Sequence, residues 1–540
     1  MKRFLRIVSL LLCLLLLAGC TPKQTQSATE KALEEIHALG TSPDDNYRTF
    51  YEIFVYSFCD SNGDGIGDLQ GVISKLDYLQ ELGITGIWLM PVHPSQSYHK
   101  YDVADYYNID PAYGTMEDME ALLSQCEERG IKVILDLVLN HTANNHPWFL
   151  AACEYLRSLP EDAEPSIDEC PYINYYYFTR EASTIDYPIE GSTWYYEGKF
   201  SPDMPDLKQH SPEVREEIAK IVEFWLNKGV HGFRLDAVKE FYSGNPQENA
   251  QFLSWLQETA AAIKPDVYLV GEAWDGFGTL QQYYESGISS FFAFPFGTSD
   301  GKIAQVLRNA GNESIVTTYA TALETADSTY VGIHPDYIDA PFLSNHDVGR
   351  IMGFVNRDVN KAKLAGAMNI FMSGSCFIYY GEEIGMIGSG NDPSKRAPMY
   401  WNTARDNGTT NPPPECELPE EYLCGSLEEQ MSDDASVYNY YRQAIAIRNA
   451  MPAIARGRTT AETVLNTGCV SAFRKTTADS QCIILMNIST EPAVVDLCRH
   501  TLWELAATLS ADGGEIQEEF TNEGTLLILP PYGVAVLTAQ

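Results

Sequence analysis

Apolar and polar residues alternate along most of the chain in a pattern that predicts strands separated by helices. From position 49 onward, short runs rich in β-branched and aromatic residues are followed by stretches with Leu, Glu and Lys at helical spacing. Strands are expected at 49–56, 84–90, 131–139, 231–236, 267–273, 289–296, 338–344 and 376–380, and helices at 71–82, 116–129, 212–228 and 247–263. Eight apolar strands alternating with helices predict an α/β fold, a (β/α)8 TIM barrel.

Two regions depart from this alternation. The interval from Asp136 to Asp236 is 100 residues, far longer than a βα unit of about 30 residues, so we expect a small inserted domain after the third strand. Short alternating strands at 469–475, 481–488, 492–497 and 525–538 predict a C-terminal antiparallel β-sandwich. The expected boundaries are 47–141 and 208–454 for the barrel, 142–207 for the insertion and 455–540 for the sandwich.

The N-terminus has the pattern of an export signal. Three basic residues within the first six positions precede an apolar run at 7–18, which is short for a bilayer span. The run closes with Leu17-Ala18-Gly19-Cys20, which resembles a bacterial lipobox and implies cleavage of 1–20 and lipidation of Cys20. The alternative is a plain secretory signal. Residues 21–46 are polar and predict a stalk, so we expect a protein on the extracellular face of the membrane, held only by its lipid anchor.

The charge of the chain excludes one class of partner. A formal net charge of −38 makes a nucleic acid an improbable ligand, because polyanions are bound by basic patches. We expect a monomer. Of the 12 cysteines, Cys416 with Cys424 and then Cys153 with Cys170 are the best candidates for disulfides in an oxidising compartment. Free buried thiols are the alternative.

Polar residues collect where the expected strands end. Because the carboxyl ends of barrel strands form one face, these polar and charged side chains should converge there: Asp136, Asn140, His141, Arg234, Asp236, Glu272, His346 and Asp347. Any one of them alone could be a helix cap or a turn residue. Carboxylate pairs in one cleft are the machinery of glycoside hydrolysis, in which one stays ionised and the other carries a proton.

The order of residues suggests which carboxylate does which. Arg234 lies two residues before Asp236, so both side chains point to the same face of a strand. A guanidinium there would keep Asp236 anionic, which suits a nucleophile. Glu272 lacks such a cation nearby in sequence and suits the proton donor. Asp347 and His346 would bind sugar hydroxyls.

Five ordered segments then show a resemblance that covers nearly the whole mature chain. They are DLVLNH (136–141), MPDL (204–207), GFRLDAVK (232–239), GEAW (271–274) and FLSNHD (342–347). The chain is similar to the α-amylase family, glycoside hydrolase family 13. The resemblance implies Asp236 as nucleophile, Glu272 as general acid/base and Asp347 as transition-state stabiliser. It also implies retention of configuration, with the carboxyls of Asp236 and Glu272 about 5–5.5 Å apart.

The same resemblance implies residues that bind substrate. Arg234, His141 and His346 match subsite residues, Lys239 is the lysine of the strand-four motif, and Tyr101 matches an aromatic residue that stacks on the reacting sugar.

The segment DSNGDGIGD at 60–68 is a candidate metal loop. Its hard oxygens, those of Asp60, Asn62, Asp64 and Asp68 with the Ile66 carbonyl, suit Ca²⁺. A Gly/Asp-rich turn without a metal is the alternative. Asn140 and Asp206 match positions that ligate a further calcium in many α-amylases.

Two departures bear on specificity. Many α-amylases have His after the strand-four lysine, whereas Glu240 follows Lys239 here, and MPDL is intermediate between amylases and oligosaccharide-cleaving relatives. We expect endo-hydrolysis of α-1,4 bonds in starch-type glucans or maltooligosaccharides. The alternatives are an oligo-α-glucosidase, neopullulanase-like or transglycosylating enzyme of the same family, and an inactive sugar-binding lipoprotein.

Overall fold

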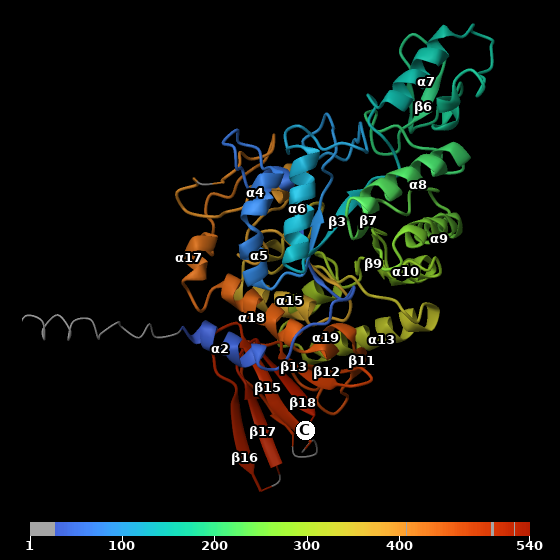
Figure 1. Ribbon diagram of the computed structural model, residues 1–540. Coiled ribbons are helices and arrows are strands. Elements are labelled where there is room, and N and C mark those ends of the chain that lie inside the picture. Colours follow the sequence, from blue (N-terminus) through green and yellow to red (C-terminus); the bar gives the residue numbers. More distant parts are fainter. Residues whose placement is uncertain (1–26, 407, 498–501, 523, 540) are drawn as a thin grey trace, which may run out of the picture.

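A curled parallel sheet forms the centre of the computed structural model, which describes residues 27–406, 408–497, 502–522 and 524–539 (Figure 1). Its strand order is β10-β1-β2-β3-β7-β8-β9. The strands are β1 (Thr49–Ile53), β2 (Gly86–Leu89), β3 (Lys132–Leu137), β7 (Gly232–Leu235), β8 (Tyr268–Gly271), β9 (Ser290–Phe291) and β10 (Cys376–Tyr379). Their inward side chains form one apolar cluster that fills the barrel, including Phe50, Trp88, Tyr268, Phe292 and Phe377. The predicted TIM barrel is confirmed.

The segment 338–344, where a strand was expected, closes the barrel without forming a regular strand. It makes a single parallel bridge, from Ala340 to Phe292. On one side Ala293 donates its backbone N–H to Ala340, and on the other Ser375 and Phe377 donate theirs to 339 and 341. The backbone bonds that complete the sheet are therefore present, although the segment is too irregular to count as a strand.

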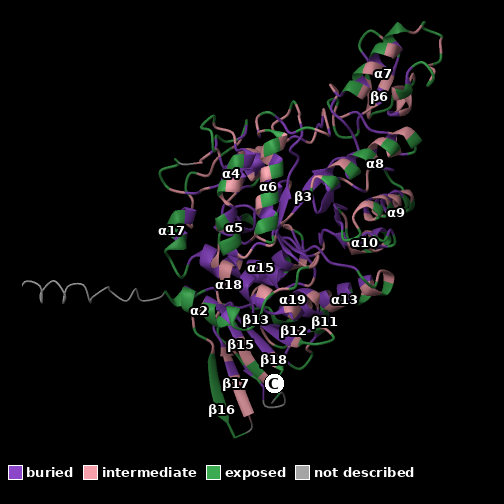
Figure 2. Ribbon diagram, viewed as in Figure 1, coloured by how far each residue is buried: buried purple, intermediate pink, exposed green. Residues whose placement is uncertain are grey.

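Helices cover the outside of the barrel, as Figure 1 shows for α4–α6 on one side and α8–α10 on the other. Figure 2 shows the sheet buried and the outward faces of the surface helices exposed, because these helices are apolar along one stripe. Helix α15 differs, since it is buried on all sides from Ala362 to Ile370. The predicted helix 71–82 is two helices, α4 and α5, that meet at Lys75. The helices of the barrel region are α3 (Val55–Phe58), α4 (Leu69–Ser74), α5 (Leu76–Leu82), α6 (Met116–Glu128), α8 (Pro212–Asn227), α9 (Pro246–Ile263), α10 (Phe277–Tyr284), α11 (Lys302–Arg308), α12 (Glu313–Val316), α13 (Thr318–Ile333), α14 (Ile351–Phe354), α15 (Val359–Ile370), α16 (Asp392–Lys395), α17 (Leu427–Met431), α18 (Val437–Ala450) and α19 (Pro452–Arg456).

The segment between β3 and β7 builds a small body of its own, which projects from the barrel (Figure 1). A three-stranded antiparallel sheet in the order β4-β6-β5 packs with one helix. Phe149 on the helix contacts Tyr176 and Tyr196 edge-on. The elements are α7 (Pro147–Ser158), the short 3-10 helix η1 (Pro171–Asn174), β4 (Phe178–Thr179), β5 (Asp186–Pro188) and β6 (Tyr195–Glu197).

The C-terminal region is an antiparallel sandwich, as predicted. A five-stranded sheet, β11-β12-β13-β18-β15, faces a three-stranded one, β14-β17-β16, and a separate apolar cluster lies between them. The predicted strand 525–538 is two strands in different sheets, because Pro530 and Pro531 cannot donate to a ladder. The strands are β11 (Arg458–Ala461), β12 (Val470–Thr476), β13 (Gln481–Asn487), β14 (Ala493–Asp496), β15 (Trp503–Ser510), β16 (Gln517–Thr521), β17 (Gly524–Leu529) and β18 (Gly533–Ala539).

The predicted stalk at 21–46 is wrong for the part that the structure describes. Residues Ala28–His37 form helix α2, with Ser27 as its N-cap. Leu33 and Ile36, three positions apart on one helix face, are buried in the main core. Glu30 pairs with Arg442 of α18 at 2.9 Å. This helix is docked on the barrel rather than acting as a free spacer, whereas the predicted signal at 1–20 and Cys20 lie outside the described residues.

The nine cysteines within the described ranges are free thiols. Neither Cys416 with Cys424 nor Cys153 with Cys170 forms a disulfide, and the alternative of free thiols holds for them. Among the same residues, no helix combines the length and the apolar character needed to cross a bilayer.

Candidate active site

One buried guanidinium organises the carboxyl end of the barrel. Parallel register places Asp136 of β3 beside Arg234 of β7. Arg234 is fully buried, and its Nη1 lies 2.7 Å from Asp136 Oδ1 and 2.6 Å from Asp236 Oδ1. Its Nη2 lies 2.8 Å from Glu272 Oε2. The two terminal nitrogens of Arg234 therefore contact Asp236 and Glu272, the two carboxylates predicted to act as nucleophile and proton donor, and hold them close to each other.

Glu272 is placed to hold a proton near neutral pH. It follows β8 and is buried, and Oε2 also accepts the backbone N–H of Ala237 at 3.2 Å. Burial raises the pKa of Glu272 to about 7, with Asp236 and Asp347 adding to the rise and Arg234 opposing it. The sequence expectation that Glu272 lacks a neighbouring cation is wrong, because Arg234 contacts it directly.

Asp347 has two cations of its own. His346 Nε2 lies 2.9 Å from one oxygen, and Arg396 Nη2 lies 2.9 Å from the other. Burial alone would raise the pKa of Asp347, but these two partners hold it far below its usual range. Burial would likewise lower the pKa of His346, yet Asp347 and Glu52, whose carboxylate lies 2.6 Å from Nδ1, raise it to about 9. Asp347 is therefore an ionised carboxylate in a cationic frame.

Tyr101 and His141 lie beside these carboxylates. The hydroxyl of Tyr101 donates to Asp136 at 3.0 Å, and its ring stacks on His346 with centroids 5.3 Å apart. The Arg234 guanidinium lies 5.7 Å from the centroid of the same ring, so Tyr101 packs against two basic residues of the site. His141 is buried, and its Nε2 has no hydrogen-bond partner among the described residues. That nitrogen is available to a ligand.

Lys239 lies beside the strand that carries Glu272. Its Nζ donates to the Trp274 carbonyl at 2.8 Å and lies 3.5 Å from Asp275. Trp274 is 48% exposed and stacks on Phe294 with ring centroids 5.3 Å apart. An exposed, supported indole two residues from Glu272 is a surface on which a sugar ring can pack.

The structure reveals three site residues that sequence reasoning missed. Glu52 at the end of β1 buttresses His346, Arg396 pairs with Asp347, and Trp274 lies at the rim. Trp274 belongs to a segment already recognised as GEAW, so its position was a usable signal. Glu52 sits in an apolar run as an isolated acid, which is unusual in a buried strand. Arg396 lies in a loop with no periodicity to mark it.

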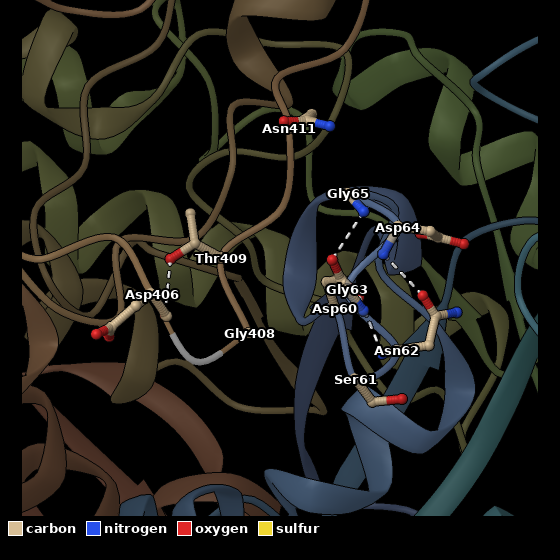
Figure 3. Close-up of a pocket in the computed structure, with 10 residues that line it drawn as sticks. All are labelled: Asp60, Ser61, Asn62, Gly63, Asp64, Gly65, Asp406, Gly408, Thr409 and Asn411. Carbon is tan, nitrogen blue, oxygen red and sulfur yellow. Dashed lines mark hydrogen bonds between the residues drawn. The ribbon is translucent and has the colours of Figure 1, made fainter.

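The loop at 60–68 faces a cavity of about 550 Å³ (Figure 3). Asp60 accepts backbone N–H groups from Asn62, Gly63 and Gly65, and Asp64 accepts that of Ile66. Figure 3 shows Asp60, Asn62 and Asp64 together along this turn. Two carboxylates and one amide oxygen at a cavity wall are a donor set that suits a hard cation.

Asp68 takes a different position from the other three. It is buried, accepts the N–H and hydroxyl of Ser61, and caps α4 through the N–H of Gly71 at 2.7 Å. In the described part of the chain, no group of three or more His, Cys, Asp or Glu side chains is arranged to hold a metal. A cation here would therefore depend on Asn62 and on the carbonyl of Ile66 as well as on carboxylates.

Comparison with known proteins finds similarity to α-amylases and related glucosidases over most of the chain. The family model described as "Alpha amylase, catalytic domain" matches residues 52–457. Alpha-amylase 3 of Dictyoglomus thermophilum is 42% identical over 417 residues, covering 76% of this chain and 78% of that protein. Glucan 1,6-alpha-glucosidase of Streptococcus pneumoniae is 29% identical over 511 residues, covering 82% and 90%. The solved structure of Eubacterium rectale Amy13B has a TM-score of 0.90 at 43% identity, covering 96% of this chain and 99% of that one.

Proposed function

The chain belongs to the α-amylase family of glycoside hydrolases, and on this premise we propose that it cleaves internal α-1,4 bonds of starch-type glucans with retention of configuration. The observation that carries the proposal is the Arg234 guanidinium, which contacts both Asp236 and Glu272 at 2.6 and 2.8 Å. Two carboxylates held across one gap are what a double displacement needs.

In the first step, a carboxylate oxygen of Asp236 attacks the anomeric carbon while Glu272 gives its proton to the departing glucosidic oxygen. The bond to the leaving glucan breaks as the bond to Asp236 forms. A pKa of about 7, raised by burial, supports Glu272 as the donor, because a substantial fraction is protonated near neutral pH. Arg234 fixes the direction of attack by holding the Asp236 carboxylate.

In the second step, Glu272 has lost its proton and acts as a base. It takes a proton from a water molecule, whose oxygen attacks the anomeric carbon and releases Asp236. Two inversions give net retention. Asp347, ionised between His346 and Arg396, would stabilise the positive charge on the sugar and bind its hydroxyls. Tyr101, His141 and Lys239 would contact the substrate around it.

The same site supports a second candidate, an oligo-α-glucosidase, neopullulanase-like or transglycosylating enzyme. Glu240 departs from the amylase pattern, and one relative is named as a glucan 1,6-alpha-glucosidase. An inactive sugar-binding lipoprotein is disfavoured, because Asp236, Glu272 and Asp347 are all retained in bonded contact with basic groups.

Two further proposals concern the rest of the chain. We propose that Asp60, Asn62, Asp64, Asp68 and the Ile66 carbonyl hold Ca²⁺. Asp60, Asn62 and Asp64, which line the cavity, support the proposal, whereas Asp68 accepts hydrogen bonds from Ser61 and Gly71. The ion would stabilise the turn rather than take part in bond cleavage. We also propose that Cys20 is lipidated, which would place the enzyme on the extracellular face of the membrane. We further propose that the enzyme is a monomer.

Product analysis on amylose, pullulan and maltotriose tests the specificity. An endo-amylase lowers the viscosity of amylose early and releases a spread of maltooligosaccharides. Glucose as the first product from maltotriose, with slow loss of amylose viscosity, would reject the endo assignment in favour of an oligo-glucosidase. The absence of any cleavage of the three substrates would refute the proposed endo-amylase activity.

A further inference from the structure

An ion pair joins the inserted segment to the loop that follows β7. Lys199, just after β6, places Nζ 3.1 Å from Glu240 Oε2 and donates to Ser243 Oγ at 2.7 Å. Ser243 in turn donates to the same Glu240 carboxylate at 2.8 Å. The lysine is 36% exposed and the glutamate 17%. These three side chains make a closed triangle between two parts of the chain that are far apart in sequence.

The residues that match a second calcium site do not fit one here. Asn140 Nδ2 donates to Asp206 Oδ1 at 3.0 Å, and the Lys199 backbone N–H donates to Oδ2 at 2.9 Å. Asn140 thus presents an N–H rather than its amide oxygen to this carboxylate, whereas Ca²⁺ takes oxygen ligands. Glu197, Asp206 and Glu240 line one cavity of about 350 Å³, and the Lys199 ammonium supplies positive charge beside it.

The loop that Lys199 holds also runs along the strand end that carries Glu272. Val238 donates its N–H to the Glu272 carbonyl at 3.1 Å, and Lys239 Nζ donates to the Trp274 carbonyl at 2.8 Å. Glu272 is the proposed proton donor to the leaving oxygen, so this loop borders the space that the leaving glucan occupies. Glu240 is the next residue along the loop from Lys239.

We propose that Lys199 and Glu240 form a metal-free clasp, which fixes the inserted segment against the β7 loop and so shapes the subsite for the leaving sugar. The carboxylate of Glu240 is used by the clasp and is a positioning group, not a contact to the sugar. This inference rests on the proposed hydrolytic function. It assigns a purpose to the departure from the histidine that many relatives have after the strand-four lysine.

Two substrates separate this role from general stability. Maltopentaose places sugars in the leaving subsite, whereas 4-nitrophenyl α-maltoside, cleaved at its aryl bond, places an aryl group there. For Lys199→Met and Glu240→Gln we expect KM for maltopentaose to rise about three- to fivefold, as loss of a partly exposed ion pair implies, with kcat nearly unchanged. Kinetics on the aryl substrate should stay within about twofold. Lys220→Met, which removes a lysine paired only within α8, is the matched control.

The double variant tests whether Lys199 and Glu240 act through each other. If the pair is the clasp, Lys199→Met with Glu240→Gln should cost no more than either single change. Additive losses, equal losses on both substrates, or an unchanged KM for maltopentaose would each overturn the proposal. An unaltered protein that cleaves neither substrate would instead refute the proposed function, and the two failures are thereby distinguishable.

Discussion

Replacing Arg396 should impair catalysis although the catalytic carboxylates Asp236, Glu272 and Asp347 themselves are left unaltered. Its guanidinium donates to the His346 carbonyl at 3.1 Å, to the Tyr98 hydroxyl at 3.0 Å and to Asp347 at 2.9 Å, and the residue is 4% exposed. A buried hydrogen bond to a charged group contributes about 1.5–3 kcal/mol. If Asp347 needs this partner to stay ionised and in place, Arg396→Met should lower kcat/KM on amylose by about 10- to 100-fold.

The pH profile distinguishes positioning from simple loss of packing. Arg396 is one of the groups that lower the pKa of Asp347, so its removal raises that pKa. Activity should then be lost at a higher pH on the acid side, because Asp347 becomes protonated sooner. Arg396→Lys keeps the positive charge but not the planar guanidinium. Its kcat/KM and its acid limb should therefore lie between those of the unaltered protein and those of Arg396→Met. A melting curve of each variant checks whether it is folded at the assay temperature.

This role of Arg396 would be refuted if Arg396→Met retained kcat/KM within about twofold of the unaltered protein and showed the same acid limb of the pH profile. It would also be refuted if Arg396→Lys and Arg396→Met were equally impaired while both remained folded, since charge would then not matter. Lys395, whose Nζ donates to the Asp347 carbonyl at 2.8 Å, provides a neighbouring control. Lys395→Met should leave the acid limb in place, because it contacts the backbone of Asp347 and not its carboxylate.

The remaining predictions address the acid, the metal and the anchor. Burial raises the pKa of Glu272 to about 7, so kcat/KM should decline as pH rises through about 7, and a flat profile from pH 6 to 9 would contradict the assignment. Glu272→Gln should abolish turnover, while oligosaccharide binding measured by calorimetry persists. Chelation should lower the melting temperature if the 60–68 loop binds Ca²⁺, and Asp60→Ala should remove that response; identical melts with and without chelator would count against the ion. Cys20→Ser should move the protein from the membrane fraction to the soluble fraction, and retention in the detergent phase would argue against lipidation.

Local sequence signals predicted most of the barrel and failed where tertiary contacts decide. Apolar runs marked the strands because a parallel sheet covered by helices is buried on both faces. The segment at 338–344 has the same composition, yet it forms only one bridge. Helix α2 was mistaken for a stalk because ten residues with two buried apolar positions give a weak pattern. Its partner Arg442 lies 412 positions away, and no local pattern reports such a contact.

The motif residues at strand ends could be predicted because a parallel barrel forces those ends onto one face. The groups that tune them could not. Arg396 reaches Asp347 from a loop 49 residues later, and Glu52 reaches His346 from 294 residues earlier. Arg234 was expected beside Asp236, because the spacing of residues reports neighbours along one strand. It does not report the contact of Arg234 with Glu272, which follows the next strand.

The distribution of these cations explains which carboxylate keeps a proton. Four buried carboxylates, those of Asp136, Asp236, Glu272 and Glu52, and the partly exposed Asp347 share three basic groups, Arg234, His346 and Arg396. Asp347 alone contacts two of the cations, whereas Glu272 shares a single guanidinium with two other acids. Charging every member would leave uncompensated charge in a buried site, which is costly. Burial raises the pKa of Glu272 to about 7, and Arg234, which also contacts Asp136 and Asp236, opposes that rise only in part. Glu272 therefore holds its proton near neutral pH although a cation contacts it directly.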